Sequence, residues 1–501
     1  MLHNSSSPRD KEPTELDTLR KWQEERRARR LRGEYESAVL HLSQVINDNI
    51  HTPMNISAVR IEGAKNTRSS FLASIVAPAV QRSGDDTEDV PHTLEHVLHT
   101  TRHLAAALKK TDIFTSVEVY LDRPRDTTAA SGDVDLVFKT RERGRWYLSS
   151  STELGNSEGS ASAHARIRNV FGGAETFEAA ASLGTQTRRS FRGTLTTPLS
   201  ASMTAFAELS AYVQDRDLSS YASCTEALRG ARAVVRTGTP RTGAHEVAYD
   251  AVIRHITALT PTASFSTRQS AGTSLKSALS HTLLYDTRSD PLGLASTSGL
   301  YLKLTHELAG GAVLGGDAHH YKVEGEAQVS RRIGDSGVSV SLSAKSGIIY
   351  SLAPNGRTLF SDRFQLGGPT SVRSFRANGM GPRDGADSTG GEIFYSLGAS
   401  LISDIPTKPN WPVKAHLWLN AGRLDNLNRD GSTNSNAGTE GERAPVIPPT
   451  FLSTPSISMG LGLIYRFDPV RVEVNFGLPL ALSKGEAARR GLGVGVGLEF
   501  L

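Results

Sequence analysis

The chain divides into two regions that differ in the spacing of their apolar positions. Residues 54–141 combine alternating segments with apolar positions at helical spacing, in the order strand, helix, helix, strand, strand. From about residue 145 onward, short segments alternate apolar and polar side chains and are separated by clusters of Gly, Asn, Asp, Ser and Pro. This change of period predicts a small α+β domain followed by an all-β domain.

The N-terminal third contains one pattern that invites a chemical interpretation. Residues 1–53 are predicted to form a disordered lead and a polar helix, and residues 54–141 a domain with strands near 56–61, 117–121 and 134–138 and helices near 70–79 and 91–110. Four histidines recur at helical spacing on the second helix, namely His92, His96, His99 and His103. They could bind zinc or respond to pH, or they could form a polar stripe beside the apolar face. No cysteine or carboxylate completes a ligand set, so we expect no metal site.

The all-β region is predicted to contain about sixteen antiparallel strands. Many are close to the ~9–11 residues that a tilted strand needs to cross a bilayer. Their predicted ranges are 145–152, 160–170, 174–186, 188–197, 202–214, 226–238, 244–259, 273–286, 297–308, 318–332, 337–349, 391–403, 412–421, 455–466, 469–477 and 491–500. The alternation dilutes hydropathy, and no run of apolar residues is long enough for a helical span. We therefore predict a transmembrane β-barrel over residues 142–501.

Composition narrows the function classes. The 501-residue chain has a formal net charge of only +4, which is too small for a nucleic-acid-binding surface. The single cysteine, Cys224, excludes an internal disulfide. We find no GxSxG, Walker A or HExxH motif, so we predict that the protein is not an enzyme and has no cofactor.

The longest interruption of the alternating pattern covers residues 362–395, within a predicted loop of 350–390. Its sequence is DRFQLGGPTSVRSFRANGMGPRDGADSTGGEIFY, which we expect to lack regular secondary structure. Gly367-Gly368-Pro369 permits a tight reversal, because the glycines accept a positive φ and the proline ring fixes the φ that follows them. The segment could be a solvated surface loop with an incidental arginine, but a loop of this length in a compact domain usually has a function.

Part of this loop carries a family signature. LGGPTSVRSF resembles the lid-loop motif of the BamA-type outer-membrane assembly superfamily, and the longer run is similar to that of its mitochondrial branch, the barrel subunits of the sorting and assembly machinery (SAM). The motif residues are Leu366, Gly367, Gly368, Pro369, Val372, Arg373 and Phe375. Ser374 stands where the family usually has glycine, and we expect a serine to adopt a more ordinary backbone conformation. The order of elements in residues 54–141 likewise resembles a POTRA (polypeptide-transport-associated) domain.

The motif arginine requires a partner if the loop lies inside a barrel. We hypothesise that Arg373 points into the lumen and pairs with Glu392 or Glu473, each on the polar side of its strand. A buried guanidinium is tolerated when a carboxylate compensates its charge.

Barrel closure requires the first predicted strand to meet the last. The first carries hydroxyl residues in its second half, and comprises Trp146, Tyr147, Leu148, Ser149, Ser150, Ser151 and Thr152. The last alternates glycine with apolar residues, and the positions singled out are Gly491, Gly493, Val494, Gly495, Val496, Gly497, Leu498 and Phe500. Both strands look like weak partners, since glycine weakens strand packing. We expect a lateral gate at this seam.

The resemblance implies a function as well as a fold. It implies an insertase of the mitochondrial outer membrane that folds β-barrel precursors by templating their C-terminal strand, with the outer-membrane lipids and peripheral subunits on the cytosolic side as partners and both termini in the intermembrane space. The alternative from the residues is a protein-conducting or metabolite pore, of porin, two-partner-secretion or plastid-import type.

Overall fold

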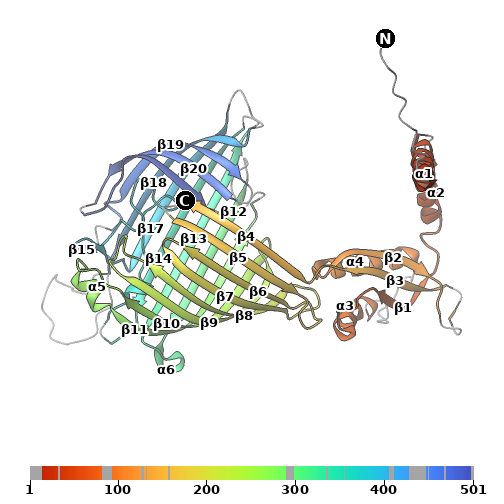
Figure 1. The fold of residues 1–501 in the computed structure, drawn as a ribbon, viewed down its shortest axis with the longest axis horizontal. Helices are drawn as coiled ribbons and strands as arrows, with labels where there is room; N and C mark the ends of the chain where they lie inside the picture. The colour runs from red at the N-terminus through yellow and green to blue at the C-terminus, as the bar shows by residue number, and fades with distance from the viewer. Residues whose placement is uncertain are drawn as a thin grey trace, which may run out of the picture. The chain divides into compact units, whose positions relative to one another are not determined.

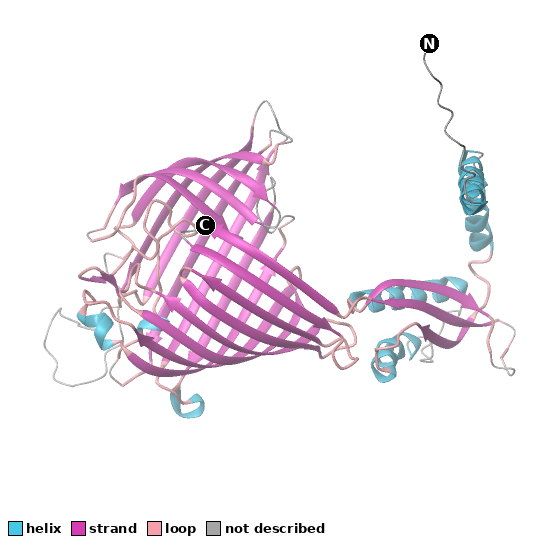
Figure 2. Cartoon of the chain, viewed as in Figure 1, coloured by secondary structure: helices cyan, strands magenta, loops and turns pink. Residues whose placement is uncertain are grey.

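The computed structural model describes most of the chain. The described residues are 14–31, 34–81, 93–125, 129–130, 132–155, 158–288, 298–334, 337–354, 356–405, 411–427, 447–448, 451–467, 470–483 and 485–497. They form two compact units, one from residues 1–65 and 72–142 and the other from residues 66–71 and 143–501. Figure 2 shows that the first unit mixes helices and strands, whereas the second is almost entirely strands.

The first unit begins with two polar helices and continues with a three-stranded sheet. The helices are α1 (Thr14–Leu31) and α2 (Glu34–Asp48), where we expected one. The elements that follow are β1 (Asn55–Glu62), α3 (Ser69–Gln81), α4 (Leu94–Lys110), β2 (Phe114–Asp122) and β3 (Asp133–Glu142). This is the strand-helix-helix-strand-strand order predicted from the sequence, with β3 between a parallel β1 and an antiparallel β2. The POTRA assignment stays a prediction.

Helix α4 buries one apolar stripe against this sheet. Val97, Leu104 and Leu108 of α4 are buried together with Leu136 and Phe138 of β3. Among the predicted histidines, His99 and His103 place their rings edge to face at 4.6 Å, and His92 lies outside the described residues. Among the helices that the structure describes, none has the length and apolar character needed to cross a membrane.

The second unit is one antiparallel sheet of sixteen strands curled into a barrel (Figure 1). The strands are β4 (Trp146–Gly155), β5 (Glu158–Arg168), β6 (Thr176–Gly184), β7 (Thr187–Pro198), β8 (Ala205–Asp217), β9 (Thr225–Thr239), β10 (Gly243–Thr257), β11 (Gly272–Asp286), β12 (Gly299–Ala309), β13 (His320–Ile333), β14 (Val338–Ser351), β17 (Ile393–Asp404), β18 (Val413–Asp425), β19 (Ser456–Phe467), β20 (Val470–Ala481) and β21 (Gly491–Gly497). The predicted barrel is thus confirmed strand by strand. Strand length is uneven: β9, β10 and β11 have 15 residues each, whereas β4 has 10 and β6 has 9.

The two faces of the barrel wall differ as the alternation predicts. Leu461, Leu463, Val474 and Phe476 are exposed on the outer face, while the intervening positions, such as Glu473, point to the lumen and are buried. The largest apolar cluster that contains residues of the connection between β14 and β17 lies on the lumenal side. It comprises Ile349, Phe364, Leu366, Val372, Phe375, Met380 and Leu424. Five of these seven residues, from Phe364 to Met380, belong to the connection between β14 and β17, so this connection packs against the lumenal side of the wall.

That connection contains more structure than the sequence suggested. It includes a 3-10 turn, η1 (Phe360–Asp362), and a short hairpin of β15 (Arg383–Asp384) and β16 (Asp387–Ser388). The prediction that residues 362–395 lack regular structure is therefore wrong. Helices α5 (Phe265–Gln269) and α6 (Gly311–Leu314), in loops at the same rim, were also not predicted.

Candidate functional site: the lid loop and the edges of the sheet

The connection between β14 and β17, hereafter the lid (residues 352–392), folds back against the lumenal side of the wall. Its two ends run together, because the amide of Phe364 and the carbonyl of Gly391 bond at 2.9 Å and the reverse bond measures 3.0 Å. A second pairing joins Leu366 to Met380. Gly367 turns the chain between them with φ of +107°, and a Cβ there would lie 2.8 Å from the carbonyl oxygen of Arg376. Glycine is therefore required at the turn that the sequence singled out.

Arg373 lies at the lid tip and contacts three strands of the wall. Its Nη2 and Nε lie 3.0 and 3.2 Å from the same carboxylate oxygen of Glu473 on β20, and its Nη1 donates to Asn420 on β18 at 3.2 Å. The guanidinium also lies 5.5 Å from the ring centroid of Trp418. Side-chain exposure is 3% for Arg373 and 0% for Glu473. The contacts surround the charge pair with further partners, as a buried ion pair requires.

The neighbours of Glu473 and of the Arg373 main chain complete this anchor. Asn475 donates to Glu473 at 2.8 Å, and Ser458 of β19 donates to the carbonyl oxygen of Arg373 at 2.6 Å. The other candidate, Glu392, binds elsewhere: it accepts from the hydroxyl of Thr358 at 2.8 Å and from the amide of Leu427 at 3.3 Å. Glu392 therefore attaches the base of the lid, while Glu473 lies at its tip.

Ser374 has a left-handed backbone conformation, which glycine adopts without strain. Its φ is +66°, so the prediction of an ordinary backbone at this position is wrong. The strain of a left-handed serine is offset by main-chain bonding, because the Ser374 carbonyl accepts from the amide of Arg489 at 2.9 Å. Space comes from Gly477 of β20, where a Cβ would lie 2.2 Å from the Ser374 hydroxyl oxygen. The only sequence signal for the space that Ser374 needs is Gly477, which lies more than a hundred positions further along the chain.

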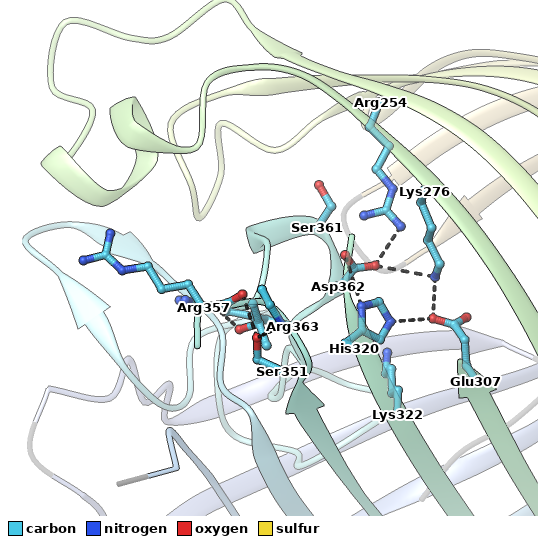
Figure 3. A network of polar contacts seen from close by, with 12 residues as sticks. Arg254, Lys276, Glu307, His320, Lys322, Ser351, Arg357, Ser361, Asp362 and Arg363 are labelled. Atoms are coloured by element: carbon cyan, nitrogen blue, oxygen red, sulfur yellow. Dashed lines mark hydrogen bonds and ion pairs between the residues drawn. The ribbon is translucent and has the colours of Figure 1, made fainter. Parts of the chain in front are cut away.

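A second anchor of the lid was missed from the sequence. Asp362 of η1 joins a network of inward-facing side chains from four consecutive strands, β10 to β13 (Figure 3). Its carboxylate lies 2.7 Å from Arg254 and 3.5 Å from Lys276. Glu307 bonds Lys276 at 2.5 Å and His320 at 2.8 Å. The sequence signal that could have revealed this anchor is the presence of opposite charges at lumen-facing positions of adjacent strands.

The side chains of the second anchor also include three groups that could ligate a metal ion. The ligand atoms of Glu307, His320 and Asp362 all lie within 4.8 Å of one another, which could suit a cation. However, the Lys276 ammonium and the Arg254 guanidinium already bond the two carboxylates. The charge that a metal ion would supply is therefore provided by the protein.

Electrostatics stabilise the ionised form of Asp362. Burial alone would raise the pKa of this carboxyl group, but the hydrogen bond from Arg254 and the charges of Arg254 and Lys276 hold the pKa below its usual range. A third anchor behaves similarly. Burial opposes the charge of Asp387, whereas bonds from Ser223, Ser264 and Thr267 lower its pKa.

The two ends of the sixteen-stranded sheet are β4 and β21. Every other neighbouring pair of strands forms a hydrogen-bonded ladder, but within the described residues none joins these two. On β4, Trp146 and Leu148 are exposed on the outer face at 76% and 78%. On β21, Gly491, Gly493 and Gly495 lie opposite Gly477, Asn475 and Glu473, so the lumenal face of the last strand carries no side chains over these positions.

The remaining predicted gate residues fall on the same two strands. Tyr147, Ser149 and Ser151 alternate with Ser150 and Thr152 along β4, and Ser151 bonds Ser162 of β5 at 2.7 Å. Val494, Val496 and Gly497 belong to the β20–β21 ladder. Leu498 and Phe500 lie outside the described residues.

Comparison with known proteins places this architecture in a family. A model of the Omp85 superfamily domain matches residues 169–500. A SAM50-like protein of Schizosaccharomyces pombe is 34% identical, over 93% of this chain and 95% of its own length. The sorting and assembly machinery component 50 homolog of Homo sapiens is 29% identical, over 81% of this chain and 84% of its own length.

A solved structure shares the fold. The crystal structure of BamA from Haemophilus ducreyi lacking POTRA domains 1–3 superposes with a TM-score of 0.70, at 15% sequence identity, over 88% of this chain and 84% of that one. With the family match and the extended similarity to its SAM50 relatives, this chain belongs to the Omp85 superfamily and, within it, to the SAM50 family.

Proposed function

We propose that this protein inserts and folds β-barrel precursors in the mitochondrial outer membrane, through a lateral gate between β4 and β21. The curated relatives are named as components of the sorting and assembly machinery, and this supports an assembly role. The gate would receive the C-terminal strand of a precursor and template its pairing. Peripheral subunits on the cytosolic side would act with it, and both termini would lie in the intermembrane space.

The observation that carries this proposal is that no ladder joins the edges of β4 and β21 in the part of the chain that the structure describes. In a bilayer, each backbone group without a hydrogen-bond partner costs several kcal/mol, because lipid tails offer none. A sheet whose described residues end at β4 and β21 without a joining ladder therefore has a strong tendency to recruit a further strand. A precursor strand satisfies these groups by main-chain pairing, which needs neither a cofactor nor a catalytic residue.

The anchored lid supports the same function rather than a transport pore. Arg373 and Asp362 hold the lid against two separate parts of the wall, on β18–β20 and on β10–β13. A passive porin keeps a polar, water-filled lumen, whereas this loop places an apolar cluster on the lumenal side. An insertase needs a wall that stays rigid while its seam parts, and the lid braces that wall.

Disulfide trapping tests the proposal. The lumenal serines Ser151, Ser162 and Ser182 form one row across β4, β5 and β6. In a Cys224→Ala background, Ser151→Cys on the edge strand should form a disulfide with a precursor that carries a cysteine in its last strand. Ser182→Cys, in the same row but two strands from the edge, is the matched control and should form none.

The outcomes separate the alternatives. Equal trapping at Ser151→Cys and Ser182→Cys would contradict strand addition at the edge. Ion conductance in liposomes without any trapping, together with normal barrel biogenesis after depletion, would instead support the pore.

A further inference from the structure

A cavity of about 440 Å³ lies between the lid tip and the last strand. Its lining includes Arg373, Phe375 and Arg376 of the lid, Arg489 before β21, and Gly491 and Gly493 of β21. Trp418 and Asn475, which belong to the first anchor, line its far side. The cavity thus borders the same strand whose outer edge lacks a ladder in the described part of the chain.

Main-chain pairing holds the cavity in shape. The amide of Arg376 donates to Ala487 at 2.9 Å, and the amide of Ala487 donates to Gly379 at 3.0 Å. The amide of Arg489 donates to Ser374 at 2.9 Å. Because these bonds involve the backbone alone, they fix the positions of Arg376 and Arg489 whatever their side chains do. Two arginines from segments distant in sequence are thereby held beside one cavity.

Both arginines are exposed, and within the described residues neither makes an ion pair. The acidic residue nearest to Arg489 in the sequence, Glu486, is hydrogen-bonded to Ser456 and to the amide of Ser483. The third arginine of the cavity, Arg373, is neutralised by Glu473. The cavity therefore has an excess of two positive charges over the groups that the described chain provides.

The lumenal face of β21 leaves room for a ligand's side chain. A strand added to its edge would direct alternate side chains to the lumen at the level of Gly491 and Gly493, where β21 has none. The adjacent strand edge offers amide and carbonyl groups that an extended peptide can pair with and a lipid cannot. Charge and shape together favour a peptide over a lipid headgroup.

We propose that this cavity is a subsite for a carboxylate side chain of an incoming strand, with Arg376 and Arg489 as its ligands. The inference rests on the proposed function, since it assumes that a strand reaches this edge. Arginine forms charge-assisted, often bidentate hydrogen bonds to carboxylates. The subsite would make the gate select strands by the charge of one lumen-facing residue.

Peptide binding to the full chain in detergent micelles tests this. The probes are short fluorescent peptides of alternating valine and serine, in which one serine position carries glutamate, glutamine or lysine. Hydrogen bonds to charged groups are stronger than those between neutral groups, so the glutamate peptide should bind about tenfold or more tightly than the glutamine peptide. Arg376→Gln/Arg489→Gln should abolish this preference, and Arg376→Glu/Arg489→Glu should shift it to the lysine peptide. Arg383→Gln, on the lid but outside the cavity, should keep it.

Each other outcome counts against a defined part of the reasoning. Equal binding of the glutamate and glutamine peptides by the unmodified protein would overturn the subsite and leave the proposed function standing. Displacement of the glutamate peptide by phosphatidylglycerol added to the micelles, but not by phosphatidylcholine, would assign the arginines to a lipid phosphate instead. If no peptide bound at all, strand addition itself would be refuted.

Discussion

Replacing Arg373 by alanine should destabilise the barrel by about 3–5 kcal/mol. The substitution removes a guanidinium that is 3% exposed and leaves the Glu473 carboxylate, which is 0% exposed, without its charge partner. Breaking one half of a buried pair typically costs this much, because the remaining charge stays desolvated. Asn475 still donates one bond at 2.8 Å, so the loss should not exceed this range.

Denaturant unfolding in detergent micelles, followed by tryptophan fluorescence, provides the measurement. Trp418 stacks beside the Arg373 guanidinium and reports release of the lid tip directly. The matched control is Arg383→Ala, another lid arginine, whose side chain bonds only the nearby carbonyl of Ala386 among described residues. It should change the free energy of unfolding by less than about 1 kcal/mol.

A double-variant cycle separates a charge effect from a packing effect. Arg373→Leu/Glu473→Leu removes both charges and should recover much of the stability lost in Arg373→Leu, since hydrophobic replacement of a whole buried pair is often neutral. Should Arg373→Ala behave like Arg383→Ala, or should the double variant be as unstable as the sum of its single variants, the buried pair would not be what holds the lid tip.

Three further outcomes are expected. Ser374→Gly should stabilise the protein by about 1 kcal/mol in the same unfolding assay, because it relieves the strain of a left-handed serine. Gly477→Ala should destabilise it, because the added methyl group would clash with the Ser374 hydroxyl. A destabilising effect of Ser374→Gly would contradict the strain argument. The pKa of Asp362 is lower in the folded protein than in the unfolded chain, where it is about 3.9. Its bond to Arg254 therefore contributes stability at pH values above about 3.9, and this contribution is lost as the pH falls through the lower pKa of the folded state. Asp362→Asn should therefore lower stability at pH 7 and flatten the acid limb of a stability–pH curve, and an unchanged acid limb would exclude Asp362 as its source. Burial raises the pKa of the Cys224 thiol to about 11. Maleimide should therefore label this buried thiol only after unfolding. Rapid labelling of the native barrel would show that the loop between β8 and β9, which contains Cys224, opens.

The sequence predicted the barrel well because the pattern that indicates each strand is local. Alternation along each strand, such as the glycines of β21 against Leu492 and Val494, depends only on which face a position occupies. The two carboxylate candidates for Arg373 followed from the same parity argument, and one of them, Glu473, lies against it in the structure.

What the sequence could not predict depends on which distant strands come to face one another. Asp362 meets Arg254 and Lys276 only because the lid crosses the lumen to β10 and β11. Ser374 could take a left-handed conformation because Gly477, on a strand far along the chain, leaves space for its hydroxyl. Both contacts depend on how the strands are staggered around the barrel, and no local periodicity encodes this stagger.

The unequal strand lengths have a consequence for the surrounding lipid. With a rise of about 3.3 Å per residue and a tilt of about 40°, the 15-residue strands β9 to β11 span roughly 38 Å, whereas β4 and β6 span only about 23–25 Å. The hydrocarbon layer is about 30 Å thick, so the short strands beside the sheet's first edge impose a hydrophobic mismatch. Acyl chains next to that edge must compress or disorder to match it. A new hairpin would then cross a thinner, softened bilayer at the place where it joins the sheet.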